Sequence, residues 1–329
     1  MLKNMSKGKI LIILLTILLL IFPFIVREMF FLSFMILCFT NIALASSWNI
    51  IGGIIGYPSF GHGVFFGLGA YVAALTIKYT GVSVLSIPFS IITTLAVSMA
   101  LGYICLRLRG MFFSLATYNI NYIFMLLFLL TPFTGGPEGV ILKPIISTSP
   151  FVLETIFYYL YMIAVCVEIF IVYKLIKSKI GLGLFAIRED EDAARTCGVP
   201  VTRLKVLAYA LSAAFQGVVG GLYAIYNCYI DPPTVFAFSI SIYQIGSTYV
   251  GGAGTLPGPI IGAIITTLLS EYFRYTLGVM VEGLNIFIYA AIILCVLLFL
   301  PEGIYGRLVF LERMKGGKEY GKSAGSGWG

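Results

Sequence analysis

Long apolar runs separated by short polar breaks make up most of the chain. A helix of about 20 mainly apolar residues can cross the hydrocarbon core of a bilayer. The runs have about that length, are bounded by Gly, Pro or charged residues, and predict about ten such helices. The predicted spans are residues 10–26, 29–48, 61–78, 84–106, 111–131, 151–174, 207–227, 235–250, 257–273 and 284–300. The eighth is the weakest pattern because it is rich in Ser and Gly. We therefore predict an all-α, polytopic transmembrane protein.

The composition agrees with this class and excludes others. The 329 residues are 60% hydrophobic and 11% charged, with a mean hydropathy of +1.01, whereas soluble domains are about 45–50% apolar and about 25% charged. No polar stretch is long enough for a soluble enzyme domain or a large ectodomain. A single histidine and six scattered cysteines without a CxxC pair predict neither a metal site nor a disulfide framework.

The placement of Lys and Arg predicts the orientation in the membrane. If both termini are inside, 17 of the 21 basic residues fall on the inner side and only Arg27, Lys78, Lys143 and Arg274 on the outer side. Basic residues gather in cytoplasmic loops, so we predict that both termini are cytoplasmic, and we interpret the excess as topology and not as nucleic-acid binding. Residues 1–308 are predicted to form the membrane domain and residues 309–329 a flexible cytoplasmic tail.

The longest polar interruption before that tail is the segment 175–206, which is predicted to be cytoplasmic. Four consecutive acids precede two alanines and Arg195, and Gly198 and Pro200 follow in the order typical of a helix end. Acidic residues near the start of a helix and a basic residue near its end interact favourably with the helix dipole. We therefore predict one short helix over about 184–197 at the membrane surface. Its apolar face would comprise Leu184, Ile187, Ala194 and Cys197. The helix is interpreted as a docking site for a cytoplasmic partner; the alternative is a solvated connection.

Within this segment, Asp192-Ala193-Ala194-x-x-x-Gly198 resembles the EAA-type coupling motif of ABC importer permeases, with Asp192 where that motif has Glu. The run from Arg188 to Lys205 resembles the LivM-type branched-chain amino acid permease family. In that family the short helix sits in a groove of the ATPase subunit. The resemblance implies the ABC importer permease fold and assigns ATPase coupling to Arg188, Glu189, Asp190, Glu191, Asp192, Ala193, Ala194 and Gly198.

Further motifs resemble the same family in the expected order, between about residues 40 and 308. They are Gly61-His62-Gly63, the segment 106–117 (LRLRGMFFSLAT), the loop 134–139 (TGGPEG) and the turn 301–304 (PEGI). The resemblance implies two cytoplasmic ATP-binding subunits, a second homologous permease and an external substrate-binding protein as partners. It also implies that ATP is used by the partner subunits, so that this chain is a transport subunit without enzyme activity or a cofactor of its own.

Two glycine-rich stretches, residues 49–70 and 250–263, allow two interpretations. Small residues at a spacing of four permit close helix packing. Alternatively, the glycines break helices, and in transporters such breaks at membrane depth are packed against protein or line a water-filled path. Both can hold at different glycines. A lone histidine is more often a packed polar residue, and interhelical hydrogen bonds are the alternative for the amides. The candidate path residues are Gly61, His62, Gly63, Gly67, Asn119, Gln216, Gln244 and Gly258.

Charged residues are few within the spans, and each is a functional candidate because burying a charge there is costly. Glu154 and Glu168 lie near helix ends, and Glu271 is expected to pair with Arg274, three residues later. No acidic pair or His–carboxylate set stands near a span centre, which argues against a proton-driven carrier. We expect a multi-pass cell-membrane permease of an ATP-driven importer for branched-chain amino acids. The alternatives are a permease of the same family for urea, amides or a sugar, and a stand-alone channel or ion-coupled carrier.

Overall fold

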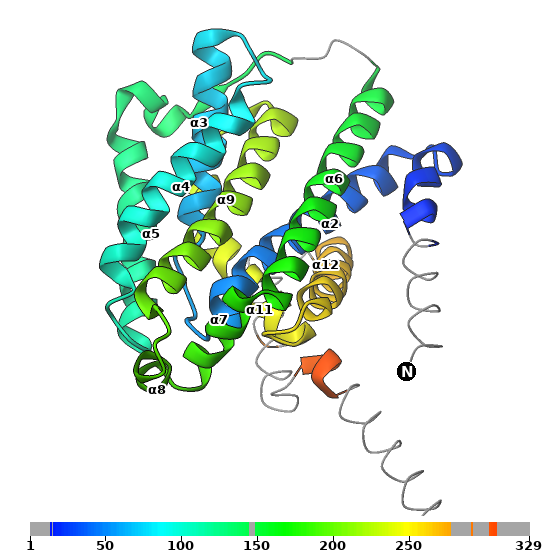
Figure 1. Cartoon of the computed structure of the whole chain (residues 1–329). Coiled ribbons are helices and arrows are strands. Elements are labelled where there is room, and N and C mark those ends of the chain that lie inside the picture. The colour runs from blue at the N-terminus through cyan, green and yellow to red at the C-terminus, as the bar shows by residue number, and fades with distance from the viewer. Residues whose placement is uncertain (1–13, 15, 145–148, 278–290, 292–302, 308–329) are drawn as a thin grey trace, which may run out of the picture.

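The computed structural model describes residues 14, 16–144, 149–277, 291 and 303–307, and this part is a bundle of helices with two short strands (Figure 1). The helices are α2 (Met29–Asn49), the π-helix η1 (Ile50–Ile54), α3 (Gly63–Thr80), α4 (Ser86–Cys105), α5 (Met111–Leu130), the 3-10 turns η2 (Pro132–Thr134) and η3 (Gly136–Glu138), α6 (Pro150–Lys177), α7 (Lys179–Glu189), α8 (Glu191–Thr196), α9 (Val201–Asn227), α10 (Pro232–Val235), α11 (Phe238–Gly251) and α12 (Pro257–Leu277). The strands are β1 (Val140–Ile141) and β2 (Tyr229–Ile230), which pair antiparallel with Val140 opposite Ile230.

The prediction of an all-α polytopic membrane protein is confirmed. Within the described residues, six helices are long and apolar enough to cross a membrane: Met29–Ile54, Gly63–Thr80, Ser86–Cys105, Met111–Leu130, Pro150–Lys177 and Val201–Asn227. They correspond to the predicted second to seventh spans. The count of about ten, the side of each terminus and the division at residue 308 stay predictions.

The remaining predicted spans differ in what the structure shows. The eighth corresponds to α11, whose 14 residues reach about 21 Å at 1.5 Å per residue and fall short of a hydrocarbon core about 30 Å thick. The ninth corresponds to the 21-residue α12. The first overlaps a shorter apolar helix, Thr16–Ile25. The tenth lies outside the described residues except for Ala291.

Of the six candidate spans, α3 and α9 are the most buried, and glycines bring these two helices together. A Cβ at Gly69 would lie 2.3 Å from the carbonyl oxygen of Gly217, and one at Gly220 would lie 2.0 Å from that of Phe66. Gly262 similarly lies against the Ser247 carbonyl of α11. Close packing of backbones therefore accounts for many of the glycines, as one of the two interpretations predicts.

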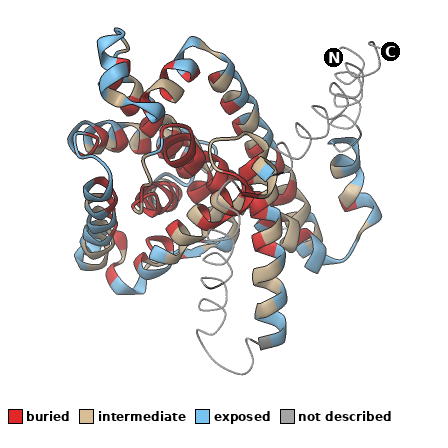
Figure 2. Cartoon of the chain, turned by 90° about the horizontal axis from the view of Figure 1, so that it is seen from below, coloured by how far each residue is buried: buried red, intermediate tan, exposed pale blue. Residues whose placement is uncertain are grey.

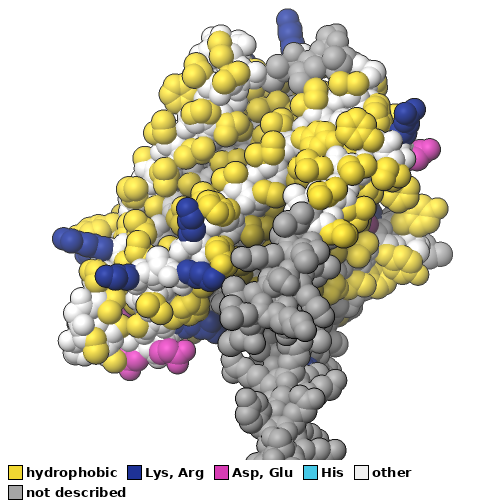
Figure 3. Space-filling view, turned by 45° about the vertical axis from the view of Figure 1, so that its right-hand side comes forward, with side chains coloured by type: hydrophobic (Ala, Val, Ile, Leu, Met, Phe, Trp, Pro, Cys, Tyr) yellow, Lys and Arg dark blue, Asp and Glu magenta, His cyan; other side chains and the backbone are white. Residues whose placement is uncertain are grey.

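Apolar side chains cover the outside of the bundle as well as its core. Figure 2 shows buried residues gathered at the centre and exposed ones at the periphery. Phe112 and Leu115 of α5 and Ile104 of α4 are more than half exposed. Figure 3 shows hydrophobic side chains over much of one face, with charged residues mainly toward its lower end. An exposed apolar surface of this extent is what a lipid environment requires.

Candidate coupling and translocation sites

The segment between α6 and α9 folds as two helices, so the prediction of one helix over 184–197 is wrong. Asp190 is extended, with φ −157° and ψ 114°, and its carboxylate accepts hydrogen bonds from the backbone N–H groups of Asp192 and Ala193, each at 2.9 Å. Asp190 thus forms the N-cap of α8 and ends α7. The two acids that follow lie in the first turn of α8, where the helix dipole favours negative charge.

The predicted apolar face is correct for three of its four residues. Leu184, Ile187 and Ala194 are buried against the membrane bundle, whereas Cys197 is exposed. Gly198 has φ +84° and follows the end of α8, as its predicted position requires. The other predicted coupling residues are exposed except Glu191, which is partly buried: the exposed ones are Arg188, Glu189, Asp190, Asp192 and Ala193.

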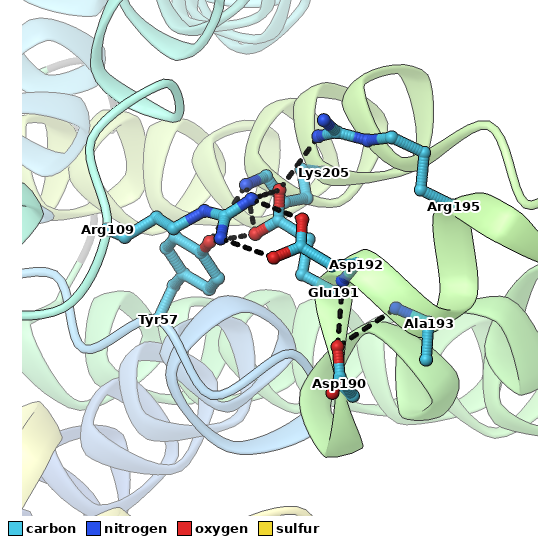
Figure 4. A network of polar contacts seen from close by, with 8 residues as sticks. All are labelled: Tyr57, Arg109, Asp190, Glu191, Asp192, Ala193, Arg195 and Lys205. Carbon is cyan, nitrogen blue, oxygen red and sulfur yellow. Dashed lines mark hydrogen bonds and ion pairs between the residues drawn. The ribbon is translucent and has the colours of Figure 1, made fainter.

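Glu191 differs from its neighbours because its side chain turns inward (Figure 4) and is only 11% exposed. Its carboxylate accepts a hydrogen bond from the Lys205 Nζ at 3.0 Å and a short one from the Tyr57 hydroxyl. The Lys205 Nζ also donates to the Tyr57 hydroxyl oxygen at 2.9 Å, and the Lys205 side chain is 3% exposed. Arg195 and Arg109 lie 3.2 and 3.6 Å from the same carboxylate. The cluster joins α8 to α9 and to the segment after η1.

Two carboxyl groups of α8 have depressed pKa values. Burial alone would raise the pKa of Glu191, but the hydrogen bonds from Tyr57 and Lys205 and the charge of Arg109 hold it below its ordinary value. Asp192 is exposed, and paired hydrogen bonds from the Arg109 guanidinium, at 2.8 and 2.9 Å, lower its pKa. Both groups are therefore ionised at neutral pH.

Arg188 connects α7 to both glycine-rich stretches. Its guanidinium donates a hydrogen bond to the Gly53 carbonyl in η1 at 2.9 Å, and it lies so close to Gly254 that a Cβ there would be 2.2 Å from Nη1. Asn49 joins the same two stretches: its side-chain amide donates to the Thr255 carbonyl at 2.9 Å and accepts from the Gly254 N–H at 2.8 Å. The chain is not α-helical from Ile50 to His62, nor from Gly252 to Leu256, so both predicted helix breaks exist.

His62 lies fully buried just before α3. Its Nε2 is 2.8 Å from the Ser212 Oγ, and that hydroxyl donates to the Ser47 carbonyl at 2.6 Å. The rings of Phe65 and Tyr209 meet the imidazole edge to face. His62 is therefore a packed polar residue in this conformation, which was the more ordinary of the two interpretations.

Gln216 and Gln244 are also buried, and they bind each other. The two amides exchange hydrogen bonds at 3.0 and 3.2 Å, and the Gln216 Nε2 also donates to the Ser47 Oγ at 2.7 Å. Ser47 thus links the pair to His62. We define the central polar network as Ser47, His62, Ser212, Gln216 and Gln244. The two serines were not predicted, because no local pattern distinguishes them from other serines in the spans.

The remaining path candidates lie in different places. Gly63 donates its N–H to the Ser241 Oγ at 3.3 Å and lies beside the network. Gly61 lies against the Thr117 carbonyl, Gly67 against the Phe236 ring and Gly258 against the Gly252 carbonyl, each closer than a Cβ would allow.

Asn119 is exposed on α5 and donates to the Leu115 carbonyl of its own helix, so the structure does not bring it together with the network.

A cavity of about 290 Å³ lies elsewhere, between α2, α6, α9 and α12. Aromatic rings, among them Phe34 and Tyr223, line it together with Glu271 and Arg274, and it contains none of the path candidates. Glu271 and Arg274 form the expected local ion pair. Within the described residues, no three His, Cys, Asp or Glu side chains are grouped so that they could hold a metal ion.

Comparison with known proteins gives one family. Residues 30–297 match the family described as branched-chain amino acid transport system / permease component. LivM, the high-affinity branched-chain amino acid transport system permease protein of Salmonella typhimurium, is 30% identical over 260 residues, which are 71% of this chain and 61% of LivM. LivM of Escherichia coli has the same identity and coverage.

A probable LivH permease of Methanocaldococcus jannaschii is 26% identical over 266 residues, or 76% of this chain and 83% of the relative. The chain spans about three fifths of the LivM relatives that it matches. No solved structure matches it.

Proposed function

Since the chain belongs to the family of permease components of branched-chain amino acid transport systems, we propose that it is the membrane subunit of an ATP-driven importer for branched-chain amino acids. In this role it receives the amino acid from an external binding protein and passes it to the cytoplasm. Its apolar helices and its family make it a multi-pass membrane protein of the cell membrane. Its relatives are named as permease proteins, not as enzymes.

The observation that best supports ATP coupling is the position of α7 and α8 (Figure 1). They carry exposed charges on one side, while Arg188 and Glu191 bind the broken parts of the membrane bundle on the other. A segment built this way connects a protein in the cytoplasm to the helices that must move. We propose that it docks on a cytoplasmic ATP-binding subunit, one for each of two permease chains.

ATP hydrolysis is assigned to those partner subunits. Residues 316–323 (GGKEYGKS) match the letters of the phosphate-binding loop GxxxxGK[ST]. However, such a loop follows a buried apolar strand and opens a helix, whereas the residues directly before Gly316 are Glu312, Arg313, Met314 and Lys315. These residues lie outside the described part of the chain. We interpret the match as a coincidence of a Gly- and Lys-rich segment.

The central polar network suits a zwitterion with an apolar side chain. Its members are neutral amides, hydroxyls and one imidazole, so a passing ammonium or carboxylate meets hydrogen-bonding groups but no fixed charge that would trap it. These groups bind one another in this conformation. The proposed path therefore opens only when α2, α9 and α11 move, or between this chain and a second permease.

The test is reconstitution in liposomes of this chain with its genomic neighbours: the ATP-binding chains, the second permease and the binding protein. We expect leucine uptake that requires ATP inside and binding protein outside. Urea and ribose are the competing substrates in the same assay. Leucine uptake by this chain alone, driven by an ion gradient, would contradict the proposal, and selective uptake of urea or ribose would contradict the substrate.

A further inference from the structure

Arg188 and Glu191 bind the two helix breaks and α9, although Arg188 is an exposed residue. Glu189 and Asp190 are exposed, and Asp192, also exposed, is bound to Arg109 between α4 and α5. We propose that Arg188 and Glu191 are transmission residues, which carry a movement of α7 and α8 into the two helix breaks and do not contact the ATP-binding subunit. This inference rests on the proposed function, and it separates residues that the sequence motif treats as one coupling surface.

The first link is the guanidinium of Arg188. It holds the carbonyl of Gly53, which belongs to the π-helix, and it lies against Gly254, whose φ of +80° places the backbone close to it. Asn49 ties Gly254 to the end of α2. The end of α7 therefore cannot move away from the bundle without breaking the Arg188–Gly53 hydrogen bond or displacing both breaks together.

The second link is the carboxylate of Glu191. It binds Tyr57, which stands five residues before His62, and Lys205, which stands seven residues before Ser212 on α9. His62 and Ser212 are hydrogen-bonded partners in the central polar network. A displacement of α8 thus acts on both ends of that hydrogen bond, through the segment 55–62 and through the first two turns of α9.

A purely structural role for these contacts is the alternative. Ion pairs between exposed side chains add little to stability, but the Lys205 and Glu191 side chains are 3% and 11% exposed, so their loss would also affect folding. A structural role would lower the amount of folded protein, the capture of the ATP-binding subunits and uptake together. Transmission lowers only the number of substrate molecules moved for each ATP hydrolysed.

The experiment compares Arg188→Gln with Lys78→Gln in the reconstituted importer. Lys78 is an exposed cation in the last turn of α3, outside the proposed docking segment. For Arg188→Gln we expect unchanged co-purification of the ATP-binding subunits and a fall of about tenfold in leucine uptake per ATP hydrolysed, the size expected for losing a hydrogen bond to a charged group. Lys78→Gln should match the wild type. Unchanged uptake per ATP in Arg188→Gln, or loss of the ATP-binding subunits from that variant, would overturn the inference.

Tyr57→Phe is the second variant, in case Arg188→Gln fails to fold. It removes one hydroxyl and leaves the Lys205–Glu191 pair in place, and we expect uptake per ATP to fall about threefold, with the ATP-binding subunits retained. A wild-type ratio of uptake to hydrolysis in this variant would also overturn the inference. Failure of the wild-type complex to show any ATP-dependent uptake would instead contradict the proposed function, so the two failures are distinguishable.

Discussion

The Lys205 Nζ lies 3.0 Å from a carboxylate oxygen of Glu191, although the two residues stand fourteen positions apart and on different helices. Lys205 lies in the first turns of α9, which begins at Val201, before the predicted span 207–227. Burying a charge is costly unless it is paired. Glu191 and Tyr57 bind the Lys205 ammonium, so this contact attaches the start of α9 to α8.

Replacement of Lys205 by Met should destabilise the protein. It removes the buried cation beside the Glu191 carboxylate, while Arg195 and Arg109 remain within 3.2 and 3.6 Å of it. The loss should therefore be smaller than the roughly 3–5 kcal/mol of breaking a fully buried pair by removing one partner. The double variant Glu191→Leu/Lys205→Met removes both charges and should lie closer to the wild type. Thermal unfolding in detergent measures the difference. Equal loss in the single and double variants would show that the ion pair is not the cause.

Acid should weaken the attachment of α8. A carboxyl whose pKa is depressed by folding adds stability that is complete above its unfolded pKa and is lost as the pH falls through its folded value. The pKa values of Glu191 and Asp192 lie below their ordinary values of 4.5 and 3.8. We expect their contribution to be constant from pH 8 to 6 and to fall below about pH 4.5. Melting temperatures across this range, compared with those of Glu191→Gln/Asp192→Asn, test this, because the variant should lose less on acidification.

Substitution of Gly198 tests the turn between α8 and α9. Glycine adopts its φ of +84° without strain, whereas an L-residue with a large side chain is destabilised by about 1–2 kcal/mol in this left-handed conformation. No atom lies within 4 Å of where its Cβ would be, so a side chain itself has room. Gly198→Leu should reduce co-purification of the ATP-binding subunits, and Gly198→Asn, which tolerates this conformation, should reduce it less. Equal effects of Leu and Asn would point to a loss of contact and not to backbone strain.

The amide pair of the central polar network should show strong coupling. Gln216→Leu leaves the Gln244 side-chain amide without its partner, while the Ser47 hydroxyl keeps its hydrogen bond to the Leu44 carbonyl. A buried polar group left unsatisfied costs about 1–3 kcal/mol. Gln216→Leu/Gln244→Leu should therefore be less destabilised than the sum of the two single variants. A double-mutant cycle of unfolding free energies measures the coupling. Simple additivity would contradict the observed hydrogen bonds.

Lys322→Ala tests the interpretation of the GGKEYGKS segment. In a working phosphate-binding loop the lysine contacts the β- and γ-phosphates, so its loss would abolish ATP hydrolysis. We expect wild-type hydrolysis and wild-type uptake in the assembled complex. A severe loss of hydrolysis, with the partner subunits still bound, would place a nucleotide site on this chain.

The sequence shows some of these features because their signals are local. Gly198 stands where a helix end needs positive φ, and the apolar spacing identifies Leu184, Ile187 and Ala194 as a buried face. The break at Asp190 was also readable, since an Asp before a run of acids and alanines is a common N-cap. The uniform charge of residues 189–192 concealed it, because all four suit the start of a helix equally well.

Other features depend on contacts between distant parts of the chain. Tyr57 and Arg109 meet α8 across 134 and 83 residues, and neither has a pattern that sets it apart from other tyrosines and arginines near helix ends. Likewise, Glu191 and Asp192 are neighbours of the same charge, yet their side chains are 11% and 67% exposed. Which acid turns inward is decided by where α9 places Lys205, and that is a property of the assembled bundle.

The two hydrogen bonds of Asn49 have a consequence for how this protein can change over evolutionary time. Its single amide satisfies backbone groups of Gly254 and Thr255 more than two hundred positions away. A substitution at position 49 cannot be compensated by a change in neighbouring residues, because the backbone groups that lose their hydrogen bonds belong to a loop far away in the sequence. Aligned homologues should therefore show correlated replacement between these two regions, with a loop of altered length or conformation wherever the asparagine is lost.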